Sequence, residues 1–175
     1  MSTKTVLRKR LSSYWKLELM NVVAVPAIMI FVAVMAGHKI GLGAYLTMVP
    51  MCGLLIIGGI YWRVKYQALE VGPSAIWKAM PLINFAKIPL LLLSLAAIIY
   101  ASALWVYSDL KISNGSRWIA TASAVMAGLE YVNYYHRQLQ HFDHWADFKK
   151  LLTGKGFRRA QMARDLEDWK TKRKR

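Results

Sequence analysis

The sequence is poor in cysteine and in acidic residues, and it lacks the common catalytic motifs. Its one cysteine, Cys52, lies in an apolar run and cannot form an intrachain disulfide, so it is interpreted as a small buried apolar residue. The chain has no glycine-rich phosphate loop, no Gly-x-Ser-x-Gly elbow and no His-Glu-x-x-His pair. These absences exclude the corresponding nucleotide, serine-hydrolase and zinc sites. We therefore expect no catalytic residue and no cofactor.

What the chain has in abundance is apolar side chains and positive charge. Of its 175 residues, 56% are hydrophobic, and the formal net charge is +15. Soluble proteins rarely combine these two properties. A membrane protein with basic segments on one side combines them naturally, so the composition predicts an integral membrane protein of a single domain.

Four apolar segments are candidates for spanning helices, at about 19–37, 41–62, 88–108 and 118–136. A bilayer requires roughly 20 predominantly apolar residues per spanning helix. The fourth segment is apolar for only twelve residues before Glu130, so that residue is expected within or near the bilayer. A cleavable signal peptide ending near residues 34–36 is the alternative for the first segment. The long basic leader and long apolar run favour a retained anchor.

The basic residues predict the orientation. Of the 24 Lys and Arg residues, 21 fall in the N-terminal arm, the loop at 63–87 and the C-terminal tail. Four spans place these three segments on one face, which the positive-inside rule makes cytoplasmic. The predicted fold is therefore an all-α membrane protein with four transmembrane helices and both termini inside.

The flanking segments complete the predicted organisation. Residues 1–18 form a cytoplasmic basic arm, either a short helix on the lipid headgroups or a frayed, solvated segment. The loop at 63–87 holds two short amphipathic pieces. The fourth helix is expected to extend beyond the membrane to about Leu152, and a last amphipathic helix covers 157–169. Residues 137–175 are thus predicted as a basic cytoplasmic helical tail, and 19–136 as the transmembrane domain.

A polar stripe at the cytoplasmic end of the fourth helix is the candidate site. Helical spacing aligns Glu130, Tyr134, Arg137, His141 and His144, with Asn133 and His136 on the flanks. An ionisable residue at membrane depth is costly and usually faces a bundle interior or a watery cavity. Glu130 has three interpretations: a polar pocket, a clamp bonded to Arg137, Lys87 or Asn84, or an interface residue that reaches water. The clamp is preferred.

Other ligands receive weaker support. The histidines have no second cluster to complete a shell, so no metal site is expected. The basic tail is interpreted as contacting lipid headgroups rather than nucleic acid, because headgroups are the nearest anions. Headgroup contacts are expected from seven residues: Arg8, Lys9, Arg10, Arg63, Lys65, Arg158 and Arg159.

The run Glu130-Tyr-Val-Asn-Tyr-Tyr-His136 resembles one found at the end of the last span in small multi-pass bacterial membrane proteins of unassigned function. The resemblance implies a bacterial cytoplasmic (inner) membrane. It implies no reaction and transfers no catalytic residue.

Three functional hypotheses follow. The first is a non-enzymatic inner-membrane protein that anchors, assembles or regulates a membrane-protein partner through its basic helices. The second is a small transporter or channel subunit, working as a homo-oligomer, with Glu130 in the path. The third, an enzyme acting on a lipid or isoprenoid, is the weakest, because only Glu130 is expected near membrane depth and metal-assisted lipid chemistry usually needs several carboxylates.

Overall fold

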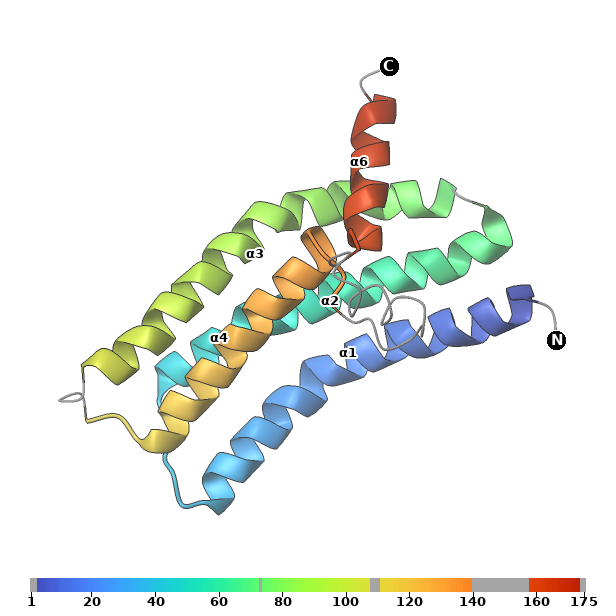
Figure 1. Ribbon diagram of the computed structural model, residues 1–175. Helices are drawn as coiled ribbons and strands as arrows, with labels where there is room; N and C mark the ends of the chain where they lie inside the picture. Colours follow the sequence, from blue (N-terminus) through green and yellow to red (C-terminus); the bar gives the residue numbers. More distant parts are fainter. Residues whose placement is uncertain (1–2, 73, 108–110, 140–157, 174–175) are drawn as a thin grey trace, which may run out of the picture.

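The structure is a computed structural model, and it describes residues 3–72, 74–107, 111–139 and 158–173. Over these ranges the chain is helical, with no β-strand and one isolated bridge between Arg137 and Arg159. Figure 1 shows the helices in chain order, and they are α1 (Thr3–Met35), α2 (Leu42–Val71), α3 (Ser74–Val106), α4 (Asn114–Tyr135) and α6 (Gln161–Arg173).

Three of these helices are long and apolar enough to cross a membrane. They are α1 over Thr5–Met35, α2 and α3, of 31, 30 and 33 residues. At 1.5 Å per residue each extends for about 45–50 Å, which exceeds a hydrocarbon core of about 30 Å. The prediction of an all-helical chain with long apolar helices is therefore confirmed, and the chain has the character of a membrane protein. The helix α4, of 22 residues, is not among the three.

The four helices α1 to α4 lie side by side, and α2 packs on each of the other three. The α1–α2 and α3–α4 connections lie at one end of the bundle, which we call the connection end (Figure 1). The start of α1, the tight α2–α3 turn and α6 lie at the opposite end, which we call the terminal end. The connection end therefore holds the two interhelical connections, and the terminal end holds the start of α1 and α6.

Small residues let the helices approach closely. Where α3 meets α4, the buried side chains are mostly alanines spaced four apart, at 97 and 101 on α3 and at 120 and 124 on α4. In α2, a Cβ added to Gly53 would lie 2.7 Å from a methyl group of Leu90. In lipid, helix association depends on such packing because hydrophobic burial supplies little drive. The small residues therefore allow α2 and α3, and α3 and α4, to pack at short distances.

The predicted C-terminal amphipathic helix is present, beginning at Gln161 rather than near residue 157. Met162 and Leu166 are buried at 1% and 4% exposure, and Trp169 packs against the same core. These three residues are the stripe expected from the sequence. The helix contacts α3 and α4 at the terminal end (Figure 1).

The prediction of an extended fourth helix was wrong, because α4 ends at Tyr135. Beyond that residue the backbone N–H of Gln138 donates to the Arg158 carbonyl at 2.8 Å, and that of Ala160 donates to the His136 carbonyl at 3.1 Å. The Leu139 N–H donates to the Asn133 side chain at 2.9 Å. The backbone groups that would continue α4 therefore bond to residues 158–160, and these bonds hold the start of α6 against the end of α4.

Two further segments differ from expectation. Residues 63–71 and 74–87 are helical, and Gly72 at the end of α2 has φ +92°, a conformation that favours glycine. The two amphipathic pieces predicted in that loop are the end of α2 and the start of α3. Likewise, the basic arm is the first part of α1, so the described residues of the arm are helical rather than frayed.

Candidate functional site

The candidate site lies where α1, α2 and α4 meet, toward the terminal end. Glu130 and Tyr134 are one turn apart on α4, as their spacing predicted. The Tyr134 hydroxyl lies beside Gly58 of α2, and the Cβ of Glu18 of α1 lies 3.6 Å from a Cβ added at the neighbouring Gly59. The structure therefore brings together two acidic side chains from different helices around one phenol.

The Tyr134 hydroxyl is buried without a well-formed hydrogen bond. The residue is 3% exposed, and among the described residues its oxygen has no partner of good hydrogen-bonding geometry. Buried hydroxyls usually have such a partner. The buried phenol without such a partner marks this position as a candidate site.

Gly58 of α2 makes room for the Tyr134 ring. A Cβ added at Gly58 would lie 2.3 Å from the Tyr134 hydroxyl oxygen, and one added at the neighbouring Gly59 would lie 2.7 Å from Leu19. Neither position tolerates a side chain without movement of its neighbours. The glycine pair thus sets the depth at which Tyr134 meets Glu18 and Glu130.

The hydrogen bond that the described residues show for Glu130 is a local one, and the predicted clamp to Arg137, Lys87 or Asn84 stays a prediction. The Asn133 amide donates to the Glu130 carboxylate at 3.3 Å. Lys87 instead lies 5.9 Å from the ring centroid of Tyr135, and the Tyr135 hydroxyl donates to the Ile83 carbonyl at 2.9 Å. Asn133 therefore connects the acidic pair to the end of α4, because its other side-chain atom receives the Leu139 N–H.

Two further members of the predicted stripe, His136 and Arg137, lie beyond the end of α4. His136 is exposed and lies beside the Tyr131 ring, with centroids 5.6 Å apart. Arg137 is exposed and pairs through its backbone with Arg159. His141 and His144 lie outside the described residues. The stripe assumed a continuous helix, and the end of α4 at Tyr135 separates its members.

A second polar cluster fastens α6 to α2. Asp165 accepts a hydrogen bond from the Tyr61 hydroxyl at 2.7 Å and forms a 2.6 Å ion pair with Lys65. The side chains of Lys65 and Asp165 are only 18% and 15% exposed. A cavity of about 20 Å³ lies beneath α6 between Tyr61, Tyr134 and Met162, which is room for one water.

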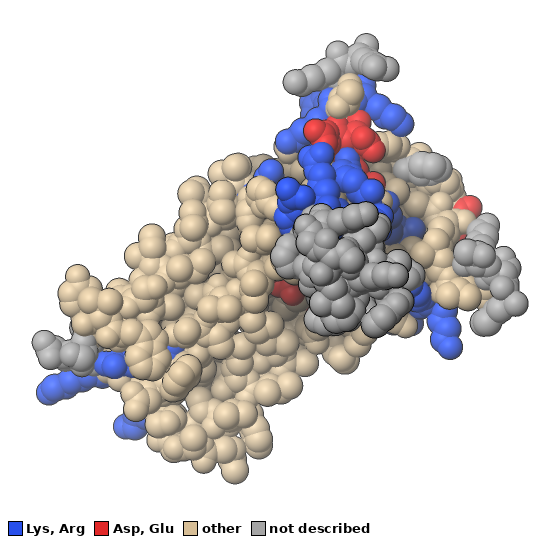
Figure 2. All heavy atoms as spheres, viewed as in Figure 1, with Lys and Arg blue, Asp and Glu red and all other residues tan. Residues whose placement is uncertain are grey.

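The residues expected at lipid headgroups belong to the first part of α1, the last part of α2 and the segment just before α6, toward the terminal end (Figure 1). Figure 2 shows Lys and Arg side chains around α6. Lys65 is turned toward Asp165 instead of outward. Arg8 pairs with Glu70 at 2.6 Å, and Arg63 lies 5.5 Å from the centroid of the Trp15 ring. Arg159 forms an ion pair with Glu167. Lys9 is exposed, and Arg10 donates to the Tyr14 hydroxyl at 2.9 Å. The Arg158 carbonyl accepts the hydrogen bond from the Gln138 N–H.

Sequence reasoning missed Glu18, Tyr61 and Asp165. A signal for Glu18 was present, since it is the sole acidic residue before Glu70 and stands directly before the first apolar run. Asp165 carried no comparable signal, because its partners are about 100 residues away in the sequence. The six other charged residues of α6 make the helix resemble a solvated surface.

Within the described residues, no group of three or more His, Cys, Asp or Glu side chains is arranged to hold a metal ion. Comparison with known proteins found no matching family model, no similar curated protein and no similar solved structure. The resemblance of residues 130–136 to small bacterial membrane proteins therefore stays an expectation.

Proposed function

We propose that the chain is an integral membrane protein with four spans, α4 being the fourth. Its 22 residues rise about 33 Å, enough for a hydrocarbon core of about 30 Å. Its polar side chains Ser116 and Ser123 are buried inside the bundle, away from lipid. A helix that is enclosed by its neighbours can be less apolar than one that faces lipid, and small residues suit such interfaces.

Both termini are proposed to be cytoplasmic, in a bacterial inner membrane. The described basic residues of the arm, of the α2–α3 region and of α6 lie toward the terminal end, and Figure 2 shows only a few basic side chains at the opposite end. The positive-inside rule assigns the more basic end to the cytoplasm.

The proposed role is non-enzymatic: the bundle holds α6 at the membrane surface, where α6 anchors or regulates a partner protein. The observation that carries this proposal is the Tyr61–Asp165–Lys65 cluster, which fixes one face of α6. Met162 and Leu166 bury the same face, while Glu167, Asp168 and Lys170 are exposed on the outer one. A rigidly held helix with a charged outer face suits a partner that complements mixed charges.

An affinity experiment tests this role. The chain with an N-terminal tag is crosslinked in membranes, and captured proteins are compared between wild type and a variant carrying Asp168→Ala and Lys170→Ala. The proposal expects one or more partners to be lost from the variant while α6 stays docked. The matched control is Lys9→Ala, which removes an exposed basic residue from α1. Partner sets that are identical for wild type and the α6 variant would contradict the role.

A second function is favoured by the acidic pair. Glu18 and Glu130 lie near the buried Tyr134 hydroxyl and form an acidic position in the bundle, as in small transporter or channel subunits that carry protons or cations. Such a subunit would work as a homo-oligomer. Flux through vesicles containing the purified chain should disappear with Glu130→Gln and persist with Glu167→Gln, which lies on exposed α6. Equal flux in both variants would contradict this function.

A further inference from the structure

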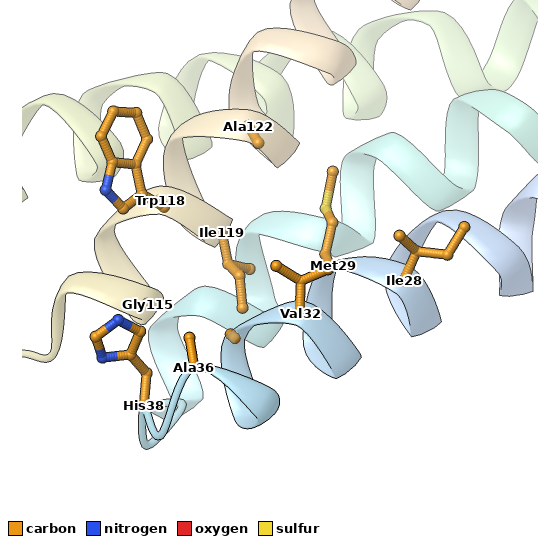
Figure 3. A pocket seen from close by; sticks show the side chains of 10 residues that line it. Ile28, Met29, Val32, Ala36, His38, Gly115, Trp118, Ile119 and Ala122 are labelled. Atoms are coloured by element: carbon orange, nitrogen blue, oxygen red, sulfur yellow. The ribbon is translucent and has the colours of Figure 1, made fainter.

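An apolar groove opens between α1 and α4 near the connection end. It has a volume of about 430 Å³, within the range of small-molecule pockets. Figure 3 shows Met29 and Val32 of α1 and Ile119 of α4 directed into the space between the two helices. The groove exists because α1 packs mainly on α2 and diverges from α4. In a bilayer its open side faces the acyl chains.

A polar cleft adjoins this groove at the end of the bundle. The cleft, of about 650 Å³, lies between the α1–α2 and α3–α4 connections and is lined by Lys39, Lys111, Ser113 and Ser116. His38 lines both the cleft and the groove. The two spaces therefore adjoin at His38, with an apolar space along the helices and a polar one at the end of the bundle.

Two basic residues and no acidic residue are among the described residues that line the cleft. Lys39 and Lys111 are exposed, and neither ammonium group forms an ion pair over the ranges that the structure describes. Three basic residues fall in the two connections and the first turn of α4, namely Lys39, Lys111 and Arg117, and two of them line this cleft. Positive charge at this end is thus scarce and concentrated where the groove opens.

The mouth of the site is held in place by hydrogen bonds. The Ser116 hydroxyl accepts the Gly41 N–H at 2.9 Å and donates to the Lys39 carbonyl at 3.2 Å. The Ser113 hydroxyl also donates to the Lys39 carbonyl. His38 packs against Gly115, where an added Cβ would lie 2.5 Å from the His38 Cβ. A preorganised site loses less entropy when it binds a ligand.

We propose that this site binds one anionic glycerophospholipid, with the headgroup phosphate at Lys39 and Lys111 and an acyl chain in the α1–α4 groove. The charge of the cleft complements a headgroup anion, and the lining of the groove complements a hydrocarbon chain. The proposal does not depend on the role of α6 or on the acidic pair. It requires only that α1 and α4 lie in the bilayer.

The test uses the full chain in vesicles of phosphatidylglycerol and phosphatidylcholine in equal parts. Lipid retained after transfer to mild detergent is identified by native mass spectrometry. We expect wild type to retain phosphatidylglycerol in preference to phosphatidylcholine. Removing both charges, in Lys39→Gln with Lys111→Gln, should weaken retention about thirtyfold. The matched control, Lys9→Gln with Lys78→Gln, removes two exposed charges at the terminal end and should retain the lipid.

A second pair of variants tests the groove. Ala122→Phe fills it, whereas Val125→Phe places the same side chain at an exposed position of α4 that does not line it. A phosphatidylglycerol carrying a photoreactive group in its acyl chain should label peptides containing Trp118 in wild type and in Val125→Phe, but not in Ala122→Phe. If Ala122→Phe does not accumulate, Ala122→Leu replaces it.

Three outcomes of these experiments, and a fourth from competition with phosphate, would overturn the proposal. They are equal retention of the two lipids, wild-type retention by the lysine variant, and unchanged labelling in the groove variant. Displacement of the lipid by inorganic phosphate alone would also overturn it, because that result would identify a free anion site with no contribution from the groove.

Discussion

Tyr61 of α2 and Asp165 of α6 form a 2.7 Å hydrogen bond between residues 104 positions apart in the sequence. The same carboxylate pairs with Lys65, one turn beyond Tyr61 on α2. This contact places α6 on the bundle and links the membrane-facing helices to the charged helix that we propose to be the functional surface.

Asp165→Ala should release α6. Its removal leaves Lys65 unpaired in a position where the side chain is only 18% exposed, at a cost of about 1–3 kcal/mol. Hydrogen exchange of the amides of residues 162–169 should accelerate about tenfold or more. The control is Asp168→Ala, an exposed position on the same helix, and it should exchange like wild type. Equal exchange in the two variants would show that Asp165 does not hold α6.

Gly58→Ala should destabilise the bundle. The new Cβ would lie 2.3 Å from the Tyr134 hydroxyl oxygen, and overpacking of this kind typically costs about 1–3 kcal/mol. Gly128→Ala on α4 is the matched control, since its Cβ would make an ordinary 3.5 Å contact with Ile98. Thermal unfolding in detergent should separate the two variants.

A double variant checks the cause. Tyr134→Leu in the Gly58→Ala background removes the ring atoms that clash and should recover part of the lost stability. Strictly additive effects of the two substitutions would mean that Gly58 and Tyr134 do not contact each other.

Ser116→Ala should loosen the connection end. The substitution removes the acceptor for the Gly41 N–H and the donor to the Lys39 carbonyl, for an expected loss of about 1–3 kcal/mol. Ser94→Ala is the control, because the Ser94 hydroxyl donates to the Leu90 carbonyl within α3. A melting temperature for Ser116→Ala that equals that of Ser94→Ala would indicate that Ser116 does not join the two connections.

The sequence was most informative where side chains alone decide the structure. The apolar runs at 19–37, 41–62 and 88–108 located three long helices, because length and hydrophobicity are local properties. The stripe of Met162, Leu166 and Trp169 located α6 for the same reason. The helices extend past the apolar runs because Arg8, Arg63 and Lys65 find partners there rather than ending the helix.

Prediction failed where distant backbone groups compete with the helix. The pattern beyond Tyr135 is helical by periodicity, yet the bonds of Gln138 and Ala160 turn the chain toward α6. Only the α4 residues of the candidate site were predicted, because contacts between distant helices leave no local pattern. Glu130, Asn133 and Tyr134 share one helix and could be grouped from spacing, whereas Glu18 joins them through the packing of α1 on α2, which no local pattern encodes.

Residue 111 precedes α4 in the sequence and residue 170 follows it. The accessibility of these two positions to a membrane-impermeant reagent therefore tests most directly whether α4 crosses the membrane. In a Cys52→Ala background, single cysteines are introduced as Lys9→Cys, Lys111→Cys and Lys170→Cys, and intact cells are treated with a membrane-impermeant maleimide. We predict labelling of Lys111→Cys from outside and labelling of the other two only after permeabilisation. Labelling of positions 111 and 170 from the same side would contradict the four-span arrangement.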